Sequence, residues 1–355
     1  MLKIAVYTIA LNEEKFVERW YNSAKDADLL LIADTGSSDK TVELARSFGI
    51  QVEAIKVEPW RFDVARNMNL AMIPEDFDIC IQLDMDEILP DGWRSKVEEA
   101  FLEGNVWPQY KHVWKRRPDG TPHTYQLYFK IHPRHGLRWV FPIHEMLIPD
   151  GTKEFVSKKL DLEVDHLQDL TKSRASYLEL LEKAIIETPN EWRMNFYLQR
   201  EYRVLQRWED VLKAGTKALA LPTGFNAERA SCCMWSAEAA YELGFVDWAI
   251  EWANKGICEA PLFFEPKGLR AHFAYLMKDW STCYKYAIQV LTHTRPEFIM
   301  VRPDYWDWYM YDLIALSAYH LGKQDEALYF GQLAIDGRPD DTRLKENLKY
   351  YSSKK

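Results

Sequence analysis

Two aspartates stand two residues apart in a segment whose residue types could bind a metal ion. Asp84 and Asp86 follow directly on an apolar run over residues 77–83. At the end of a β-strand, this spacing puts both carboxylates on the same face. Carboxylate oxygens suit Mg²⁺ or Mn²⁺, which commonly bridge a few carboxylates to substrate phosphates. The pair therefore predicts a divalent metal site that holds a phosphorylated ligand, with a solvated turn as the alternative.

Other polar residues also follow apolar runs in this part of the chain. Asn12 and Glu14 come after the first run, and Asp34 ends the second. Arg66 has small neighbours in sequence, so its guanidinium could reach a phosphate with two hydrogen bonds. Taken singly, these residues have structural alternatives, namely a helix start, a helix-capping turn and a surface arginine. Asn12, Glu14 and Asp34 share a position after apolar runs with Asp84 and Asp86, which predicts that these residues belong to one site.

The segments between these residues alternate between the hydrophobic patterns of strands and helices. Near-continuous apolar strands that alternate with helices predict an α/β domain, with a mostly parallel sheet covered by helices on both faces. In such an open sheet, ligands bind outside the carboxyl ends of the strands, where the polar residues fall. The predicted strands cover residues 3–11, 29–34, 51–57 and 77–83, and the predicted helices cover residues 13–23, 40–47 and 62–72.

The composition of the chain changes after about residue 106. Aromatic and β-branched segments are separated there by turns that contain proline and glycine. Such segments predict antiparallel hairpins, which we expect to cover residues 106–148 and to extend one side of the sheet.

From about Thr171 onward the chain has helical periodicity and repeats itself. Small residues recur where paired helices would touch, and a proline follows each of the two best copies. This pattern resembles the tetratricopeptide repeat, whose period is about 34 residues. The aligned positions near the starts of the second helices are Val211, Ala249, Cys283 and Ala327, at spacings of 38, 34 and 44 residues.

These changes of pattern divide the chain into two predicted domains. We expect an α/β domain over residues 1–165 and an all-α, tetratricopeptide-like domain over residues 170–355. Repeats of this kind stack into extended binding surfaces. The helical domain could therefore select a partner molecule or form a homodimer.

The ordered combination of polar motifs resembles family 2 glycosyltransferases of the GT-A fold. Order and spacing match over roughly residues 1–150, although no single motif is specific. A helical-repeat segment behind such a domain is similar to the bacterial and phage branch that includes the peptide S-glycosyltransferases. The motifs that carry the resemblance are Ile9-Ala10-Leu11-Asn12-Glu13-Glu14, Ile32-Ala33-Asp34-Thr35-Gly36-Ser37-Ser38-Asp39-Lys40-Thr41, Phe62-Asp63-Val64-Ala65-Arg66-Asn67, Leu83-Asp84-Met85-Asp86-Glu87 and Ile143-His144-Glu145-Met146-Leu147.

The resemblance implies a site for a nucleotide-sugar donor. Thr8, Asn12 and Glu14 would line the pocket for the base and the ribose, and Asp34 would accept a hydrogen bond from the base. Arg66 would meet the diphosphate and would stabilise negative charge in the transition state. UDP is the commonest carrier in the family, so a UDP-hexose such as UDP-glucose is the expected donor.

The resemblance also implies a divalent cofactor and a catalytic base. Asp86 would bind Mn²⁺ or Mg²⁺, Asp84 would hold the ribose or the water shell of the metal, and His144 would be a further ligand. Family 2 members invert the anomeric configuration, so a carboxylate should deprotonate the acceptor. We expect Glu145 to be this base, with Glu87 as the second candidate. The expected acceptor is a peptide, a protein or a glycan.

Composition excludes several other classes of function. The net charge of −9 argues against a general nucleic-acid-binding protein, which needs clustered lysine and arginine. The five cysteines are scattered and form no CxxC pair, so we expect neither a disulfide framework nor a zinc site. No signal peptide is evident, and the apolar runs are too short to span a bilayer. We therefore expect a cytoplasmic protein with at most peripheral membrane contact.

Three other functions are alternatives to a glycosyltransferase. A phosphatase of the haloacid dehalogenase type also uses two aspartates after a strand, but on its first strand. A dinucleotide-binding dehydrogenase is disfavoured because no glycine occurs between Met1 and Thr35, so the GxGxxG turn is absent. The serious alternative is a non-catalytic repeat module for protein binding, carrying a degenerate transferase domain. Thermal stabilisation by nucleotide sugars would separate a transferase from that module.

Overall fold

A computed structural model describes the chain over residues 2–102, 104, 106–169, 177–293, 302 and 304–352. The chain divides into two compact units, Met1–Ala184 and Ile185–Lys355. Residue 170, where the predicted second domain begins, lies outside the described residues. Each unit has its own hydrophobic clusters and is described by itself.

Within the described residues, the first unit is built on a five-stranded sheet in the order β3-β2-β1-β4-β8. β1 to β4 are parallel to one another, whereas β8 runs antiparallel to β4. This mostly parallel sheet confirms the predicted α/β fold. The strands are β1 (Ile4–Ala10), β2 (Leu29–Asp34), β3 (Gln51–Ala54), β4 (Ile79–Gln82) and β8 (Ile131–Pro133), and the helices are α1 (Val17–Ala24), α2 (Thr41–Ser47), α3 (Phe62–Met72) and α4 (Trp93–Phe101).

Within the described residues, β8 extends this sheet antiparallel to β4, as the sequence predicted, but the strands that precede and follow it after residue 106 do not. β6 and β7 do form an antiparallel hairpin, but β6 pairs in parallel with β11 in a separate four-stranded sheet, β5-β11-β6-β7. β11 lies beyond the predicted hairpins and is as long as β6, so it takes the edge of β6 along most of its length. The remaining strands are β5 (Glu87–Ile88), β6 (Val106–Arg116), β7 (Pro122–Tyr128), β9 (Leu137–Val140), β10 (Met146–Pro149) and β11 (Val156–His166).

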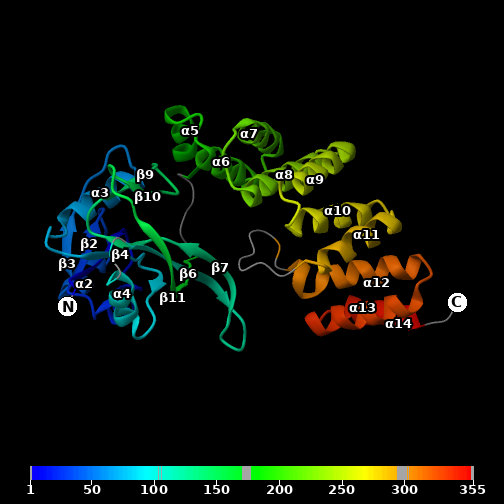
Figure 1. Cartoon of the computed structure of the whole chain (residues 1–355), viewed down its shortest axis with the longest axis horizontal. Coiled ribbons are helices and arrows are strands. Elements are labelled where there is room, and N and C mark those ends of the chain that lie inside the picture. Colours follow the sequence, from blue (N-terminus) through cyan, green and yellow to red (C-terminus); the bar gives the residue numbers. More distant parts are fainter. Residues whose placement is uncertain are drawn as a thin grey trace. The chain divides into compact units, whose positions relative to one another are not determined.

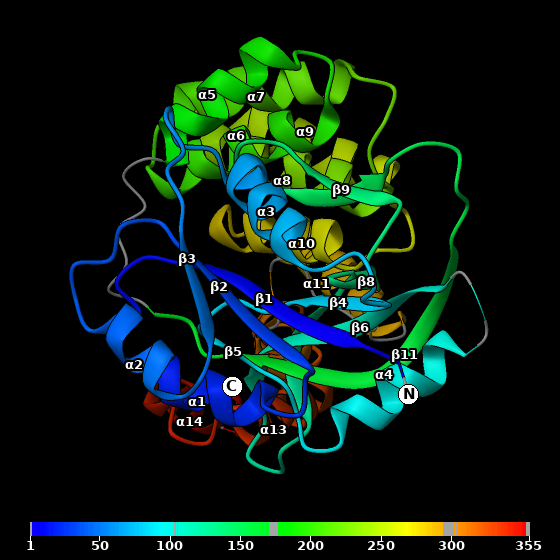
Figure 2. The same ribbon diagram turned by 90° about the vertical axis from the view of Figure 1, so that its left-hand side faces the viewer.

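Side chains of β1 alternate between two buried faces of the parallel sheet. Ile4 and Val6 lie in a core with residues of α1, α2 and α4. Ala5 and Tyr7 lie in a second core with residues of α3, β9 and β10. Figure 2 shows α3 on one side of β1 and β2, with α1 and α2 on the other. The alternation is the pattern expected of a strand buried on both faces.

The first helix begins later than residue 13, where the sequence predicted its start. α1 begins at Val17, and the backbone before it is bound by the side chains of Asp39 and of Thr41, the first residue of α2. The N–H of Glu13 donates to Thr41 Oγ1 at 2.7 Å, and the N–H of Glu14 donates to Asp39 Oδ2 at 3.1 Å. These two hydrogen bonds tie residues 13 and 14 to the segment after β2, and the loop that they hold lies beside the predicted site.

The second unit consists of helices that follow one another as packed pairs (Figure 1). Pairs α6–α7, α8–α9, α10–α11 and α12–α13 form helical hairpins with short connections. The helices are α5 (Tyr177–Glu187), which crosses the boundary between the units, α6 (Trp192–Val204), α7 (Trp208–Ala220), α8 (Asn226–Glu242), α9 (Val246–Glu259), α10 (Glu265–Leu276), α11 (Trp280–Leu291), α12 (Met310–His320), α13 (Gln324–Gly337) and α14 (Thr342–Ser352), with a π-helical turn η1 (Tyr305–Tyr309) before α12.

The helical repeat predicted from the sequence is confirmed by its register. Val211, Ala249, Cys283 and Ala327 are each the fourth residue of α7, α9, α11 and α13, respectively. All four side chains are completely buried. Small residues recur at this position because the second helix of each pair packs closely there against its neighbours.

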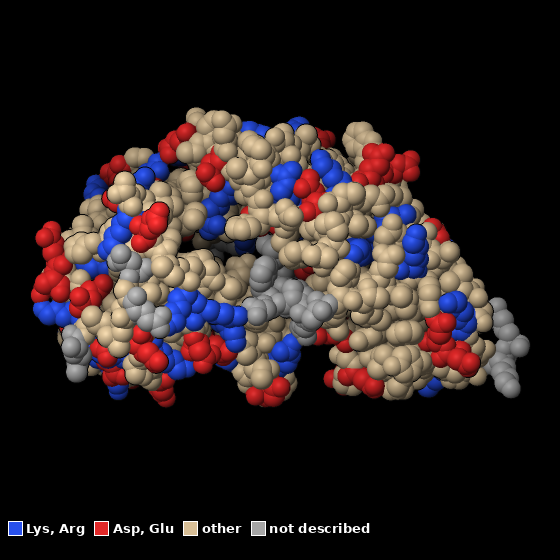
Figure 3. All heavy atoms as spheres, viewed as in Figure 1, with Lys and Arg blue, Asp and Glu red and all other residues tan. Residues whose placement is uncertain are grey.

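The surface carries both signs of charge. On the face shown in Figure 3, lysine and arginine side chains are interspersed with aspartate and glutamate, and no large area of one sign covers the second unit. None of the described helices is both long and apolar enough to cross a membrane.

Candidate functional site

The loops that follow three neighbouring strands meet at one edge of the parallel sheet. β1 lies between β2 and β4, and all three run in the same direction. Ala10 at the end of β1 pairs with Asp34 at the end of β2, and Tyr7 pairs with Gln82 at the end of β4. The predicted donor and metal residues in these loops are therefore brought to a common edge, as expected for a ligand site in an open sheet.

Asn12 fastens the loop after β1 to the loop after β2. Its Oδ1 accepts from the N–H of Ser38 at 2.8 Å, and its own N–H donates to Ser37 Oγ at 2.9 Å. The Asp34 carboxylate accepts from the N–H groups of Gly36 and Ser37, each at 3.1 Å. The φ of Asn12 is 55°, which asparagine tolerates better than most residues. Asn12 and Asp34, which are both predicted to bind the nucleotide-sugar donor, therefore shape the loops on which its base or ribose would rest.

Glu14 adds a second tie between the same loops, whereas Thr8 lies in the interior. Glu14 Oε2 accepts from the N–H of Lys40 at 2.9 Å. Thr8 is completely buried in β1, and its hydroxyl donates to the carbonyl of Ile9 at 3.2 Å. Three of the four residues predicted for the base and ribose pocket therefore come together in these loops. The fourth, Thr8, is buried inside the sheet in this structure.

Arg66 is the centre of a second group of predicted residues. Its side chain projects from α3 and is only 5% exposed. Nη2 donates to Asp84 Oδ1 at 2.9 Å, and Nε donates to Glu145 Oε1. Nη1 is buried and has no hydrogen-bond partner in the described part of the chain. A buried guanidinium N–H without an acceptor is costly, so this atom marks where an anionic group would be stabilised.

The contact between Arg66 and Glu145 joins residues far apart in the sequence. Asn67, next to Arg66, makes two hydrogen bonds with the backbone of Trp139 in β9, at 2.8 and 2.9 Å. The N–H of Phe62 donates to the carbonyl of Pro142 at 3.0 Å. These bonds hold the segment after β9 against the start of α3, and so they place Glu145 beside the guanidinium.

Lys130 is a member of this group that the sequence analysis missed. It precedes β8, and its backbone carbonyl accepts from the N–H of Gln82 at 2.9 Å. Its ammonium donates to Asp84 Oδ2 and Glu87 Oε1, each at 2.8 Å. No sequence motif singles out this lysine. Only the pairing of β8 with β4, which could not be read from the sequence, brings it beside the strand end.

Glu87, the second candidate for the catalytic base, is enclosed by hydrogen bonds. It is 1% exposed, and its Oε1 also lies 2.7 Å from Nε2 of His112. Its Oε2 accepts from the backbone N–H of Asp84 at 2.9 Å. Because both oxygens are hydrogen-bonded and the side chain is almost completely buried, Glu87 supports the loop and does not face an acceptor. Glu145 is therefore the stronger candidate for the base.

The charges in this cluster shift one another's ionisation. Burial opposes the ionised form of Asp84, but Arg66 and Lys130 outweigh it and hold the pKa of that carboxyl well below its ordinary value. Burial also opposes ionisation of Glu87, yet Lys130 and His112 lower its pKa to about 2. Burial alone would lower the pKa of Lys130, but the two carboxylates raise it well above its ordinary value. All three groups are therefore charged at neutral pH.

This network predicts loss of stability in acid. The pKa of Glu87 is about 2 in the folded chain and ordinarily 4.5, so the unfolded chain takes up the proton first as the pH falls. The contribution of Glu87 to stability is present above pH 4.5 and is lost as the pH falls towards 2. We expect the free energy of unfolding to decrease by a few kcal/mol over this window. Urea unfolding of wild type and Glu87→Gln across this range checks the assignment, because an equally steep acid dependence in the variant would contradict it.

Asp86 points towards a histidine that the sequence analysis also missed. His166, the last residue of β11, lies with its Nε2 at 3.2 Å from Asp86 Oδ2. Burial would lower the pKa of His166, but the hydrogen bond and charge of Asp86 raise it above its ordinary value. The four-stranded sheet supplies this contact, because β11 pairs with β5 just after Asp86.

The predicted metal ligands are present, but they form no complete protein cage. His144, with a φ of 50°, packs edge-on against Tyr177 at 6.1 Å between ring centroids. In the described part of the chain, no group of three or more histidine, cysteine or acidic side chains is placed to hold a metal. Both oxygens of Asp84 are engaged by Arg66 and Lys130, whereas the carboxylate of Asp86 has a hydrogen bond only with His166 among the described residues. This set fits an ion that takes one or two carboxylates and completes its shell with water and substrate phosphates.

The N-terminal unit has recognisable relatives. Residues 5–157 match the model for glycosyl transferase family 2. This unit contains a family 2 domain. The match spans β1 to the start of β11, so it includes Asp34, Arg66, Asp84 and Glu145 but ends before His166.

Two curated proteins resemble part of this chain in sequence. An uncharacterized glycosyltransferase of Rickettsia bellii is 32% identical over 133 residues, which cover 36% of this chain and 44% of that protein. An uncharacterized glycosyltransferase of Rickettsia typhi is 31% identical over 107 residues, or 30% of this chain and 35% of that protein. The chain thus spans less than half the length of these relatives.

The helical unit has a weak similarity to solved structures, with TM-scores below 0.5. MamA aligns with a TM-score of 0.38 and 13% identity, covering 50% of this chain and 98% of that chain. PilF of Pseudomonas aeruginosa aligns with a TM-score of 0.40 and 14% identity, covering 48% of this chain and 72% of that chain.

Proposed function

We propose that the chain is an inverting, metal-dependent glycosyltransferase that takes a hexose from a nucleotide-sugar donor, with a UDP-hexose as the expected donor. The observation that carries the proposal is the cluster around Arg66, which offers a buried and unpartnered guanidinium N–H beside the strand-end loops. The family 2 match over the same residues supports it. A peptide, a protein or a glycan remains the proposed acceptor.

The donor would lie across the carboxyl ends of β1, β2 and β4. The loops tied by Asn12 and Glu14 would hold the base and the ribose, together with Asp34. Arg66 would hold the diphosphate through Nη1 while its other nitrogens stay paired with Asp84 and Glu145. Because those pairs fix the guanidinium in advance, binding would cost little reorganisation.

The charge balance of the site favours a divalent cofactor. Four carboxylates, those of Asp84, Asp86, Glu87 and Glu145, lie in or beside the cluster, against the cations Arg66 and Lys130. Asp86 would hold Mn²⁺ or Mg²⁺, and His144 is kept as a proposed further ligand. When bound, such an ion supplies Lewis-acid stabilisation of charge on the leaving diphosphate.

The chain's own residues account for the remaining steps. Glu145 would take the proton from the acceptor nucleophile, which then forms a bond to the anomeric carbon from the face opposite the diphosphate. The bond between that carbon and the diphosphate oxygen breaks, and the nucleoside diphosphate leaves with both bonding electrons. Arg66 would stabilise the charge that develops on this leaving group.

A thermal-shift screen of nucleotide sugars tests the proposal. A ligand that binds only the native state stabilises it by about 2.7 kcal/mol at 100 times its dissociation constant. We expect one nucleotide sugar to raise the melting temperature in the presence of Mn²⁺ and to do so much less in its absence. If no nucleotide sugar shifts the melting temperature while a protein partner is captured, the non-catalytic binding module is favoured instead.

A further inference from the structure

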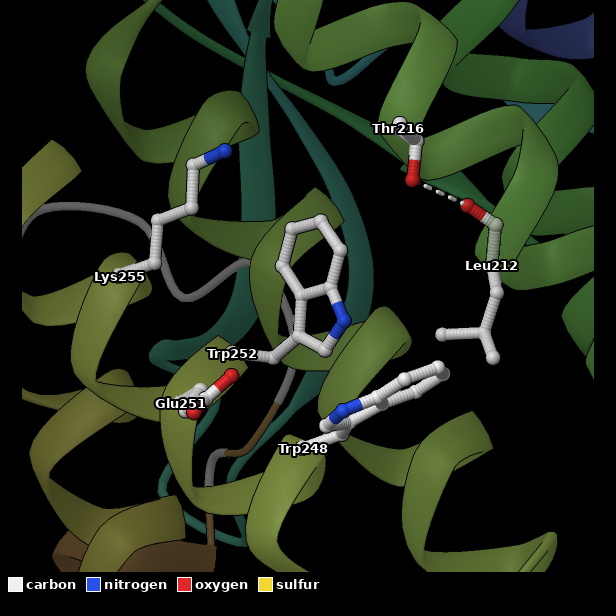
Figure 4. A pocket seen from close by; sticks show the side chains of 6 residues that line it. All are labelled: Leu212, Thr216, Trp248, Glu251, Trp252 and Lys255. Carbon is white, nitrogen blue, oxygen red and sulfur yellow. Dashed lines mark hydrogen bonds between the residues drawn. The ribbon is translucent and has the colours of Figure 1, made fainter. Parts of the chain in front are cut away.

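A groove in the helical unit combines aromatic and polar side chains. It lies between α7 and α9 and has a volume of about 410 Å³ (Figure 4). A volume in this range is typical of small-molecule sites. The residues that line the groove are Leu212, Thr216, Trp248, Glu251, Trp252 and Lys255.

Two tryptophans and Leu212 form the apolar part of this groove. Trp248 and Trp252 are four residues apart on α9, so their side chains lie on the same face of the helix. Trp252 packs partly into the cores between the helices, which fixes its position. Trp248 is 54% exposed although it is a large apolar residue. An exposed tryptophan beside a concavity is a common anchor for a bound molecule.

The polar side chains of the groove have donor and acceptor atoms that are available to a ligand. Glu251 is exposed and has no hydrogen-bond or ion-pair partner among the residues that the structure describes. The Thr216 hydroxyl donates to the carbonyl of Leu212 at 2.9 Å, which leaves its oxygen free to accept (Figure 4). The Lys255 ammonium lies 5.0 Å from the centre of the Trp252 ring and forms no ion pair within the described residues. The rim therefore offers a carboxylate acceptor and an ammonium donor.

We propose that this groove binds a neutral pyranose unit of a glycan. One face of a pyranose ring presents C–H groups that pack on an indole, and its edge carries hydroxyls that both donate and accept hydrogen bonds. Glu251 and Lys255 match such an edge because one accepts and the other donates. The inference rests on the proposed function, since a sugar-transferring enzyme would meet such a glycan as acceptor or product.

Two other occupants fit the groove less well. An apolar helix would need a continuous apolar surface, but three of the six lining residues are polar or charged. A quaternary ammonium suits aromatic rings beside a carboxylate. However, Lys255 already lies over the ring of Trp252 and would repel a second cation. Charge and shape therefore favour a neutral saccharide.

Ligand-observed NMR on the full chain without nucleotide tests this inference. The probes are the methyl glycosides of the common neutral hexoses and N-acetylhexosamines, with tetramethylammonium as the competing probe. We expect at least one glycoside to bind with an affinity on the order of millimolar, and Trp248→Ala to weaken it at least about tenfold. Tyr329→Ala, which removes another exposed aromatic side chain of the helical unit, should leave binding unchanged.

Further outcomes separate this inference from the proposed function. Asp86→Asn should retain glycoside binding, because Asp86 lies in the other unit. If a nucleotide sugar raises the melting temperature but no glycoside binds, the groove assignment is overturned and the proposed function stands. Equal binding by wild type and Trp248→Ala, or binding of tetramethylammonium without any glycoside, would overturn it as well. If glycoside binding depends on Trp248 but no nucleotide sugar stabilises the chain, the groove assignment stands. The proposed transferase function is then overturned.

Discussion

Asp86→Asn is expected to lower sugar transfer and donor hydrolysis at least about 100-fold, the size of effect seen when one electrostatic contact to the transition state is lost. The amide keeps the shape of the side chain and can still accept a hydrogen bond from His166. It loses the negative charge that would hold the divalent cofactor. Because the pair of Asp86 and His166 is partly exposed, we expect the melting temperature to stay close to that of wild type.

A matched control for this change is Asp91→Asn, which removes an exposed carboxylate a few residues away. Transfer rates and donor-induced melting shifts should be measured for both variants over a range of Mn²⁺ concentrations. We expect only Asp86→Asn to lose the metal dependence. Full activity in that variant, with an unchanged requirement for Mn²⁺, would remove Asp86 from the metal site.

Glu145→Gln is expected to lower transfer by about 10² to 10⁴-fold while donor binding is retained. A glutamine cannot take the proton of the acceptor. It can still accept the hydrogen bond from Arg66 Nε, so the guanidinium should keep its place. The expected signature is a loss of kcat for transfer with an unchanged melting shift on addition of the donor.

The control for this variant is Glu154→Gln, which neutralises an exposed glutamate in the same unit. It should behave like wild type in both assays. If Glu145→Gln instead weakens donor binding as strongly as it lowers transfer, Glu145 belongs to the donor or metal shell, and the base must be sought elsewhere.

Local patterns in the sequence were enough to predict the parallel sheet. The strand Leu29–Asp34 and the helix Phe62–Met72 have the predicted bounds, because each is marked by its own hydrophobic pattern. The start of α1 was misplaced, and the side chains that bind the backbone of Glu13 and Glu14 there come from residues more than 20 positions away, which no local pattern reveals. The pairing of β6 with β11 was also missed, because partners about 50 residues apart leave no local pattern.

The same distinction applies to the candidate site. Asp34, Arg66, Asp84 and Asp86 could be predicted because each belongs to a short motif at the end of a strand or on a neighbouring helix. Lys130, His112 and His166 could not, since strands of later segments bring them to the cluster. The contact of Arg66 with Glu145 is an intermediate case. Both residues were singled out, but their hydrogen bond depends on how Asn67 holds β9.

Calorimetric titration of nucleoside diphosphates into the full chain, for wild type and Arg66→Lys, tests the donor site most directly. Lysine keeps the positive charge beside Asp84 but loses the planar fork and its open N–H. We predict that one of UDP, GDP, CDP and dTDP binds wild type in the presence of Mn²⁺ and binds Arg66→Lys at least about tenfold more weakly. Equal binding by the two proteins, or no binding of any of the four by wild type, would contradict the assignment of this cluster as a donor site.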